Sequence, residues 1–483
     1  MLETLWFDPT RVFIEGRWRA PEGSGQLPLE NPSTGAAIGS IARGTAADID
    51  AAVGAARGAL DGDWGRMTAL ERGRILTRIG QFVQARVEDL ALIEATDVGK
   101  PLTQARNDAL ALARYMEFYG GAADKVMGET IPYLAGYTVY TLREPHGVTG
   151  HIIPWNYPMQ IIGRSVGAAL AMGNACVLKP AEEACLTALA FAALAEEAGL
   201  PPGALNVVPG LGEEAGAALT AHPGVNHISF TGSVGVGRLV QKAAADNLVP
   251  VTLELGGKSP QIVFDDADLD AALPFLVGAC IQNAGQTCSA ASRVLIQRGV
   301  YDDLVARMAD SYNGMISAPA TMDANLGPLI SAGQKAIVEG YLARGTDLRV
   351  AGQGTVIEGA PEGGHYLPAT LFADVPPTHP LAQEEIFGPV QVAIPFDTEE
   401  EAVAIANGTG YGLVASVWSE NGARQMRLAK KIRAGQVFLN NYGAGGGVEL
   451  PFGGTGLSGH GREKGFEALY GFSSLKTVAA KHD

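Results

Sequence analysis

Strand-like and helix-like patterns alternate regularly through residues 147–255. Short apolar runs such as 148–153 and 175–179 are each followed by a segment whose apolar residues recur at helical spacing. This alternation favours right-handed βαβ crossovers and therefore a parallel sheet with helices on both faces. A second series of the same kind starts at Gln261, so we expect two α/β domains. Ligands bind such sheets beyond the carboxyl ends of the strands.

The same periodicities predict individual elements. In the regular stretch, strands are expected at 148–153, 175–179, 205–208, 227–231 and 250–255, with helices at 161–172, 182–199 and 213–221 and one ending at 245. Upstream, helices are expected at 48–59, 70–97 and 102–119, and an edge strand at 138–143. Downstream, strands are expected at 261–264, 293–297, 390–394, 415–418 and 436–440, with helices ending near 282 and covering 301–315 and 331–344.

The composition excludes several classes of protein. The chain has 483 residues, 47% hydrophobic and 18% charged, which is typical of a large compact α/β enzyme. A net charge of −16 with scattered basic residues argues against nucleic-acid binding. No apolar run reaches the roughly 18–20 residues of a membrane helix, and the N-terminus lacks a signal-peptide pattern. The spacing of cysteines and histidines predicts neither a metal site nor a disulfide framework. Together with the lack of a membrane helix and a signal peptide, this favours a cytoplasmic protein without a bound metal.

Cys288 lies among small and polar residues, in the segment GQTCSAAS (285–292). A lone cysteine in an intracellular chain is most often a small core residue. Gly285, Thr287 and Ser289 instead favour a tight turn, in which the backbone approaches a ligand and leaves N–H groups free. We therefore interpret Cys288 as a candidate nucleophile, which requires a base, an oxyanion site and a cofactor elsewhere in the chain.

Two polar residues are candidates for acting with this thiol. Glu254 lies between two leucines at a predicted strand end, where partial desolvation raises the pKa of a carboxyl group and suits it to general-base work. A structural ion pair is the alternative. Asn156 follows the first strand in a turn flanked by prolines, where its amide can donate to a developing oxyanion. A plain Asx-turn explains this segment equally well.

The strand ends also carry candidates for nucleotide binding. The turn GSVGVG (232–237) lies between a strand and a helix, where free N–H groups favour an anion, but a packing turn explains its glycines about as often. Lys179 ends an apolar strand and is either a nucleotide-binding ammonium or a solvated lysine. Glu182, at the predicted start of the next helix, either accepts from ribose hydroxyls or stabilises the helix dipole.

Seven motifs, in order, resemble the NAD(P)-dependent aldehyde dehydrogenase superfamily. They are IPWNYP (153–158), VLKPAE (177–182), FTGS (230–233), LELGGKSP (253–260), GQTCSA (285–290), EEIFGPV (384–390) and PFGG with SGHGRE (451–463). The resemblance runs from about Asn31 to the C-terminus and includes the 34-residue step from Glu254 to Cys288. Each motif alone is weak, but seven in order are very specific.

The resemblance implies a fold and an assembly. The fold is α/β, with a Rossmann-like NAD-binding domain (1–123 and 146–256), a second α/β catalytic domain (257–457), and a small β oligomerisation arm with the C-terminal tail (124–145 and 458–483). Subunits of this family pair through the arm, which here corresponds to 138–143 and 474–478. A homodimer or homotetramer is therefore expected.

The resemblance also implies roles for the candidate residues. Cys288 attacks the aldehyde, Asn156 and the Cys288 N–H hold the oxyanion, and Glu254 activates the water that hydrolyses the thioester. The cofactor is NAD, with NADP possible, because Glu182 would repel a 2′-phosphate. The expected cofactor contacts are Ile153, Trp155, Lys179, Glu182, Gly232, Ser233, Leu255, Glu385 and Phe387. Among them, Lys179 and Glu182 face the adenine ribose, Ser233 the diphosphate and Glu385 the nicotinamide ribose.

The chain departs from the family pattern near the substrate. Ser165 stands where many members carry a lysine thought to relay protons from the base toward the position of Glu463. Arg164 stands where many members carry an aromatic residue, and it either faces a carboxylate or braces its helix. Succinate-semialdehyde dehydrogenases usually carry a second arginine at the position of Gln282. Its absence here argues against a substrate that carries a carboxylate, such as succinate semialdehyde.

The loop 442–447 is unusually rich in small residues and leaves room for a bulky or aromatic aldehyde. The substrate-pocket candidates are Tyr157, Arg164 and Phe452.

Two alternative functions stay open, a succinate-semialdehyde-like dehydrogenase and a cofactor-independent thiol esterase. A CoA-acylating enzyme is disfavoured because such members generally lack the base at Glu254. The esterase would need a histidine partner for Cys288, and none lies nearby in the sequence.

Overall fold

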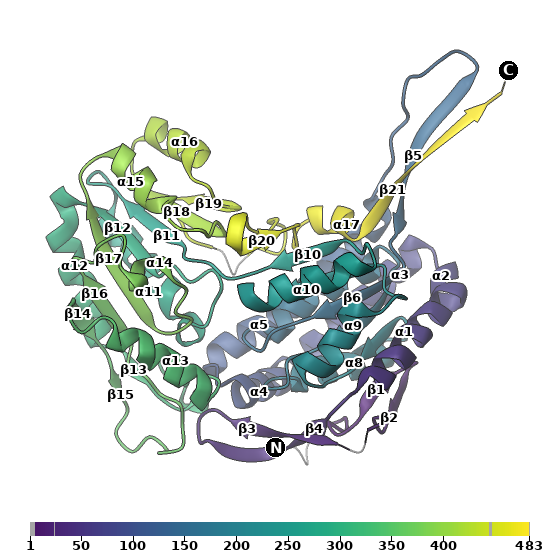
Figure 1. Ribbon diagram of the computed structural model, residues 1–483, viewed down its shortest axis with the longest axis horizontal. Helices are drawn as coiled ribbons and strands as arrows, with labels where there is room; N and C mark the ends of the chain where they lie inside the picture. The colour runs from purple at the N-terminus through teal and green to yellow at the C-terminus, as the bar shows by residue number, and fades with distance from the viewer. Residues whose placement is uncertain (1–4, 24, 444–446, 483) are drawn as a thin grey trace.

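The protein consists of two α/β units packed side by side and a two-stranded arm that projects from them (Figure 1). The structure is a computed structural model that describes residues 5–23, 25–443 and 447–482. The first unit contains an eight-stranded sheet and the second a seven-stranded sheet. Most strands in both sheets are parallel, which confirms the predicted α/β class. The domain boundaries given above stay a prediction.

The first sheet contains the five parallel strands predicted from the regular stretch. Its order is β2-β1-β8-β7-β6-β9-β10-β20. The parallel strands are β6 (Val148–Ile152), β7 (Ala175–Lys179), β8 (Leu205–Val207), β9 (His227–Thr231) and β10 (Val251–Glu254); β1 (Val12–Ile14), β2 (Arg17–Arg19) and β20 (Gly459–His460) add antiparallel edges. The chain order reverses between β6 and β9, and ligands bind α/β sheets at such switch points.

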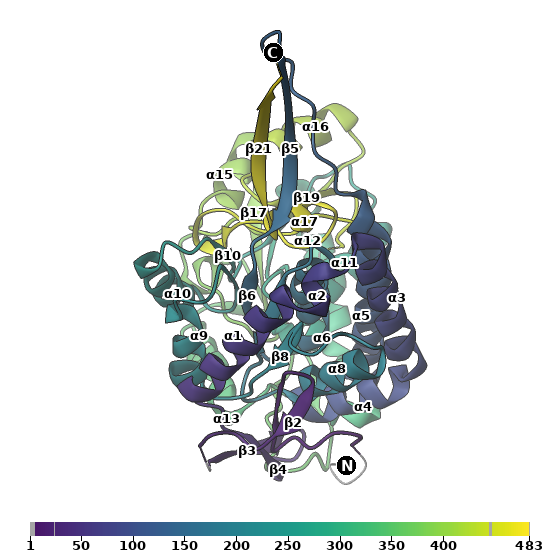
Figure 2. The same cartoon turned by 90° about the vertical axis from the view of Figure 1, so that its right-hand side faces the viewer.

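Helices cover both faces of this sheet, with α1, α9 and α10 on one side and α3, α4, α5 and α8 on the other (Figure 2). The helices of this unit are α1 (Ala46–Asp61), α2 (Asp63–Arg66), α3 (Ala69–Ala85), α4 (Val87–Val98), α5 (Leu102–Ala122), α6 (Pro158–Ile161), α7 (Gly167–Ala171), α8 (Leu186–Glu197), α9 (Ala217–Ala221) and α10 (Val234–Asp246). A π-helical segment, Ile162–Val166, joins α6 to α7.

Two of the helix predictions need correction. The segment 70–97 forms α3 and α4 because the backbone at Arg86, with φ −117° and ψ 25°, is not helical. The helix expected from 182 begins at Leu186, whose N–H donates to Asp97 Oδ2 of α4 at 3.0 Å. A side chain distant in sequence therefore sets this helix start. Glu182 lies in the preceding turn, so its interpretation as a helix-dipole residue is wrong.

The second sheet has the order β14-β16-β17-β12-β11-β18-β19. Its strands are β11 (Pro260–Val263), β12 (Arg293–Gln297), β14 (Arg349–Gln353), β16 (Thr370–Ala373), β17 (Val390–Phe396), β18 (Val414–Trp418) and β19 (Gln436–Leu439), and its helices are α11 (Leu269–Ile281), α12 (Arg298–Asn313), α13 (Ala332–Ala343), α14 (Pro380–Gln383), α15 (Glu399–Ala406) and α16 (Gly422–Lys431). The five predicted strands are confirmed. β14 and β16 escaped prediction because β14 is an irregular edge strand, with a register shift between Val350 and Gly352, and β16 is short.

The arm is a long antiparallel pair of β5 (Tyr137–Pro145) and β21 (Ser473–Lys481), with Thr141 opposite Thr477. The strand predicted at 138–143 thus pairs with the end of its own chain, and α17 (Glu467–Gly471) leads into β21. The short pairs β3 (Gln26–Asn31) with β4 (Ala36–Ala42) and β13 (Ile316–Ser317) with β15 (Thr355–Val356) complete the fold. Among the described residues, no helix is both long and apolar enough to cross a membrane.

Candidate active site

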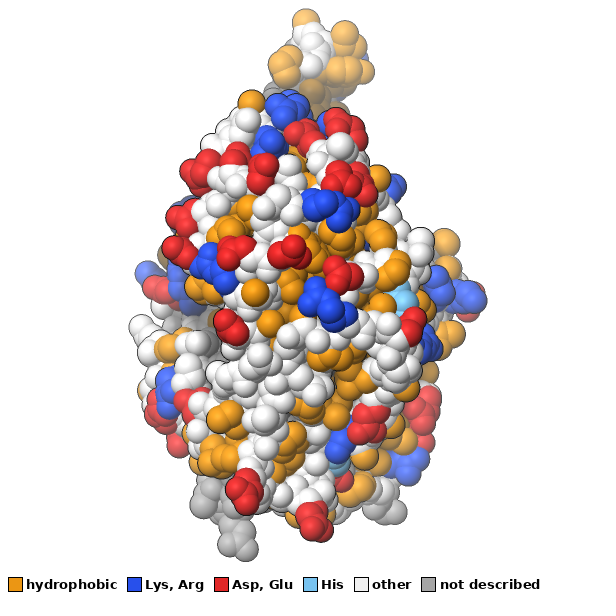
Figure 3. Space-filling view, turned by 90° about the vertical axis from the view of Figure 1, so that its left-hand side faces the viewer, with side chains coloured by type: hydrophobic (Ala, Val, Ile, Leu, Met, Phe, Trp, Pro, Cys, Tyr) orange, Lys and Arg blue, Asp and Glu red, His pale blue; other side chains and the backbone are white. Residues whose placement is uncertain are grey.

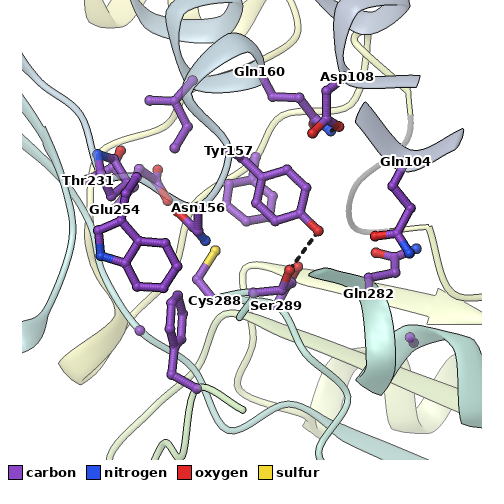
Figure 4. A pocket seen from close by; sticks show the side chains of 18 of the residues that line it. Gln104, Asp108, Asn156, Tyr157, Gln160, Thr231, Glu254, Gln282, Cys288 and Ser289 are labelled. Carbon is purple, nitrogen blue, oxygen red and sulfur yellow. Dashed lines mark hydrogen bonds between the residues drawn. The ribbon is translucent and has the colours of Figure 1, made fainter. Parts of the chain in front are cut away.

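A cavity of about 910 Å³ is lined by the carboxyl end of the first sheet and by loops of the second unit. Part of this lining is drawn in Figure 4. Eleven of the residues predicted to bind cofactor or substrate, or to act in catalysis, line it: Trp155, Asn156, Tyr157, Arg164, Gly232, Ser233, Glu254, Cys288, Glu385, Phe387 and Phe452. The fold therefore brings together residues that lie up to about 300 positions apart in the sequence.

Cys288 lies on a loop that three consecutive left-handed residues fold tightly. Asn283, Ala284 and Gly285 have φ values of 49°, 53° and 76°. A Cβ on Gly285 would lie 2.1 Å from the carbonyl oxygen of Gly388, so only glycine fits there. Burial raises the pKa of the Cys288 thiol to about 11, so the resting group is protonated near neutrality. In the part of the chain that the structure describes, the Cys288 N–H has no hydrogen-bond partner.

The side chain of Asn156 points toward the Cys288 sulfur (Figure 4). Its Nδ2 donates one hydrogen to the backbone oxygen of Gln286 at 2.9 Å, and Asn283 Nδ2 donates to the Asn156 backbone oxygen at 3.0 Å. These two bonds lock the amide against the cysteine loop and leave its second hydrogen for a ligand. The Asx-turn alternative fails because the residue that would donate, Pro158, has no N–H.

Glu254 ends β10, with β9 on one side and β20 on the other. Glu254 is only 2% exposed, and neither of its carboxylate oxygens accepts a hydrogen bond from a described residue. A Cβ on Gly453 would lie 2.8 Å from Glu254 Oε1, so the glycine makes room for the carboxylate. Burial raises the pKa of Glu254 well above its usual value, as the flanking leucines predict.

Arg164 projects into the cavity from the π-helical segment and pairs with Glu463. Its Nε lies 2.6 Å from Glu463 Oε2, and its Nη2 donates to Thr231 Oγ1 at 3.2 Å. The guanidinium therefore does face a carboxylate, one that belongs to the protein itself. The neighbouring Ser165 donates to the carbonyl oxygen of Ile161 at 2.8 Å, so its hydroxyl is held within its own helix.

Several residues near the carboxyl ends of the first sheet's strands also line the cavity. Ser233 is the N-cap of α10, and its Oγ accepts from the Val236 N–H at 3.3 Å. Glu385 Oε1 accepts from the Gly257 N–H at 3.0 Å, and burial raises the pKa of Glu385 to about 7. The rings of Trp155 and Phe387 meet edge to face, 5.4 Å apart.

Four predicted cofactor residues do not line the cavity itself: Ile153, Lys179, Glu182 and Leu255. Lys179 is only 3% exposed, and its Nζ donates to Glu182 Oε2 at 2.7 Å. The interpretation of Lys179 as a solvated lysine is therefore wrong. Residues 444–446 of the small-residue loop lie outside the described residues.

The sequence pattern of the aldehyde dehydrogenase family matches residues 18–478. The chain belongs to the aldehyde dehydrogenase family. Human retinal dehydrogenase 2 is 39% identical over 98% of this chain and 92% of its own length. A crystal structure of a Burkholderia cenocepacia protein assigned to the aldehyde dehydrogenases is 63% identical, covers 98% of this chain and 100% of that one, and has a TM-score of 0.97. The NAD⁺ complex of Bacillus cereus aldehyde dehydrogenase is 38% identical, covers 99% and 97%, and has a TM-score of 0.95.

This aldehyde dehydrogenase has a polar patch in its cavity, of which the sequence reasoning named only Tyr157. Gln160 Nε2 donates to Asp108 Oδ1 at 2.6 Å, and Asp108 also pairs with the buried Lys100. Lys100 Nζ lies 4.0 Å from the centre of the Tyr157 ring, and the Tyr157 hydroxyl accepts from Thr287 Oγ1 at 2.8 Å. A signal was present, because Asp108 interrupts the apolar face of the helix predicted at 102–119.

Proposed function

We propose that this enzyme oxidises an aldehyde to the carboxylic acid with NAD, through a thioester on Cys288 that is hydrolysed by water activated by Glu254. The observation that carries the proposal is the convergence of Cys288, Asn156 and Glu254 on one cavity that also receives the strand ends of a nucleotide-binding sheet. These side chains supply a nucleophile, an oxyanion donor and a base. The family assignment and the NAD⁺ complex of the Bacillus cereus relative support the same chemistry.

The first step is loss of the Cys288 thiol proton to solvent and addition of the resulting thiolate sulfur to the aldehyde carbon. The carbonyl oxygen then gains the negative charge, and two donors are available to it: the second hydrogen of the Asn156 amide and the Cys288 N–H. Because these donors are already held in place by the loop, they need not reorganise during the reaction. The product of this step is a thiohemiacetal on Cys288.

The residues at the strand ends fit a dinucleotide. The first N–H groups of α10, next to Gly232 and Ser233, form an anion site suited to a diphosphate. Glu385, with its raised pKa of about 7, and the Lys179–Glu182 pair offer acceptors for ribose hydroxyls. NAD, when bound there, accepts the hydride that leaves the thiohemiacetal carbon. Phe387 and Trp155 form the apolar wall beside that position.

The second half of the reaction is hydrolysis of the thioester. Glu254 takes a proton from water as the water oxygen adds to the acyl carbon, and the Cys288 sulfur leaves. The products are the carboxylic acid and the free thiol. The presence of a buried carboxylate at residue 254 supports hydrolysis over transfer of the acyl group to CoA.

An aromatic or otherwise bulky aldehyde is the proposed substrate. The aromatic side chains of Tyr115, Tyr157, Tyr442 and Phe452 line the cavity. A succinate-semialdehyde-like substrate is less well supported, because the charge of Arg164 already pairs with Glu463. A panel of aldehydes assayed for NADH formation tests this: succinate semialdehyde outperforming benzaldehyde in kcat/KM would reverse the preference.

A cofactor-independent thiol esterase is the remaining alternative. It would need a histidine beside Cys288, and none of the described residues that line the cavity is a histidine. We therefore expect aldehyde oxidation to depend strictly on NAD.

The arm formed by β5 and β21 is proposed to pair subunits in a homodimer or homotetramer, and sedimentation analysis checks this.

Asn156→Ala is expected to lower kcat by roughly 10²–10³, the usual effect of removing one oxyanion donor. The KM for aldehyde should change much less, because the amide matters most when charge develops on the oxygen. Steady-state kinetics with NAD measure both values. Asn107→Ala, at the exposed rim of the same cavity, is the matched control and should retain wild-type kcat.

Glu182→Gln is expected to raise kcat/KM for NADP by about tenfold, because removing one negative charge near the ribose is worth on the order of 1–2 kcal/mol. Lys179, released from its partner, is then available to a 2′-phosphate. Activity ratios with NAD and NADP give the measurement, and Glu183→Gln serves as the control. An unchanged ratio would show that Glu182 does not select the cofactor.

A further inference from the structure

The Arg164–Glu463 pair is almost fully shielded from bulk solvent, although Arg164 reaches the cavity wall. The side chains of Arg164 and Glu463 are 8% and 0% exposed. Glu463 Oε1 also accepts a hydrogen bond from Ser229 Oγ of β9 at 2.6 Å, and the Arg164 guanidinium lies 5.0 Å from the centre of the Phe452 ring. Because the pair is so little exposed, the field of this fixed cation is screened less than that of a surface arginine.

The pair lies beside Glu254, which has no hydrogen-bond donor of its own among the described residues. Thr231, which accepts from Arg164, is the register partner of Glu254 across β9 and β10. The charged and titratable groups that face Glu254 are Arg164 from the π-helical segment, Arg462, Glu463 and Lys464 from the C-terminal loop, and Cys288 from its own loop. Burial makes ionisation of Glu254 costly, and Arg164 is the leading charge that opposes this effect.

We propose that Arg164 is a positioning residue that favours the ionised form of Glu254 during thioester hydrolysis, acting as a fixed charge and not as a proton carrier. A guanidinium does not lose its proton under physiological conditions. Arg164 therefore cannot do the work of the proton-relay lysine that many family members carry at the position of Ser165. Its Nε pairs with Glu463 and its Nη2 donates to Thr231, so its positive charge is already matched by a carboxylate of the protein itself. This inference rests on the proposed function, because it concerns the second half of that reaction.

The test follows the hydrolysis step alone and needs no knowledge of the natural aldehyde. p-Nitrophenyl acetate transfers its acetyl group to a reactive thiol, with release of p-nitrophenolate. Intact-protein mass spectrometry of quenched samples then follows the decay of acetyl-Cys288 as a function of pH. The variants are Arg164→Met, Arg164→Lys, Glu463→Gln and the double variant R164M/E463Q, with Ser165→Ala as the control.

The variants should move the pH profile in opposite directions. The decay rate rises with pH as Glu254 loses its proton. Removing the cation in Arg164→Met makes that loss harder and should move the rise to higher pH by roughly 1–3 units, the usual effect of one nearby charge. Glu463→Gln removes a neighbouring negative charge and should move it to lower pH. Arg164→Lys and Ser165→Ala should stay near wild type.

Each single variant leaves one member of a buried ion pair without its partner, which can destabilise the fold. If a single variant does not fold, the double variant R164M/E463Q, which leaves no unpaired charge, tests the proposal instead. It should shift in the same direction as Arg164→Met, by less. A decay profile that coincides with wild type in Arg164→Met or the double variant overturns the proposal. So does an effect confined to the KM for succinate semialdehyde. Failure of the wild type to form acetyl-Cys288 would instead contradict the proposed function.

Discussion

Cys288→Ala is expected to lower kcat for aldehyde oxidation by at least about 10⁴-fold, because Cys288 is the only cysteine among the described residues that line the cavity. Asn156 and the nucleotide site remain in this variant, so NAD binding should be unaffected. NADH formation measures the first effect and NAD titration by protein fluorescence the second.

The matched control for this prediction is Cys280→Ala. Cys280 lies on α11 and is fully buried, and its thiol donates to the carbonyl oxygen of Val390 at 3.5 Å. Burial raises its pKa to about 12, so it is an inert core thiol. The control should retain wild-type kcat. Substantial NADH formation by Cys288→Ala would mean that hydride transfer does not proceed through this thiol.

Glu254→Gln is expected to slow turnover by roughly 10²–10⁴, the usual contribution of a general base. Acyl-enzyme formation should persist, because Cys288 and Asn156 are intact. The first turnover should therefore release one equivalent of NADH rapidly, followed by a slow steady state. Stopped-flow absorbance separates the two phases. Glu213→Gln, an exposed glutamate on the first unit, is the control and should show wild-type turnover.

The pH dependence of this variant gives an independent check. Burial raises the pKa of Glu254, and only the ionised carboxylate accepts a proton from water. Wild-type hydrolysis should therefore rise as pH increases through this raised pKa. Glutamine has no such titration, so that rise should disappear from the hydrolysis rate of the variant. If the variant loses the NADH burst instead of the steady state, Glu254 acts before hydride transfer and not after it.

Much of the cofactor side could be predicted from the sequence because parallel strands have local signatures. The apolar runs ending at Lys179, Thr231 and Glu254 place these residues at the same edge of one sheet, whatever the loops between them do. The turn at Gly285 was equally readable, because Gly285, Thr287 and Ser289 are residue types that favour a tight turn, and the backbone of Gly285 is left-handed. In these places local chemistry decides the structure.

Contacts between distant segments could not be predicted in the same way. The start of α8 depends on Asp97, which lies 89 residues before Leu186. The partner of Arg164 is Glu463, at the far end of the chain, so the sequence left its role open between two alternatives. Sequence periodicity carries no information about such pairings, which are set by tertiary packing.

The most direct test of the account is mass spectrometry of Glu254→Gln, quenched after reaction with benzaldehyde and NAD. We predict one benzoyl group per active subunit, located on the peptide that contains Cys288 and formed in step with the NADH burst. The same adduct should be absent from Cys288→Ala and from samples without NAD. An NADH burst without an acyl group on Cys288, or an acyl group on a different residue, would contradict the central claim.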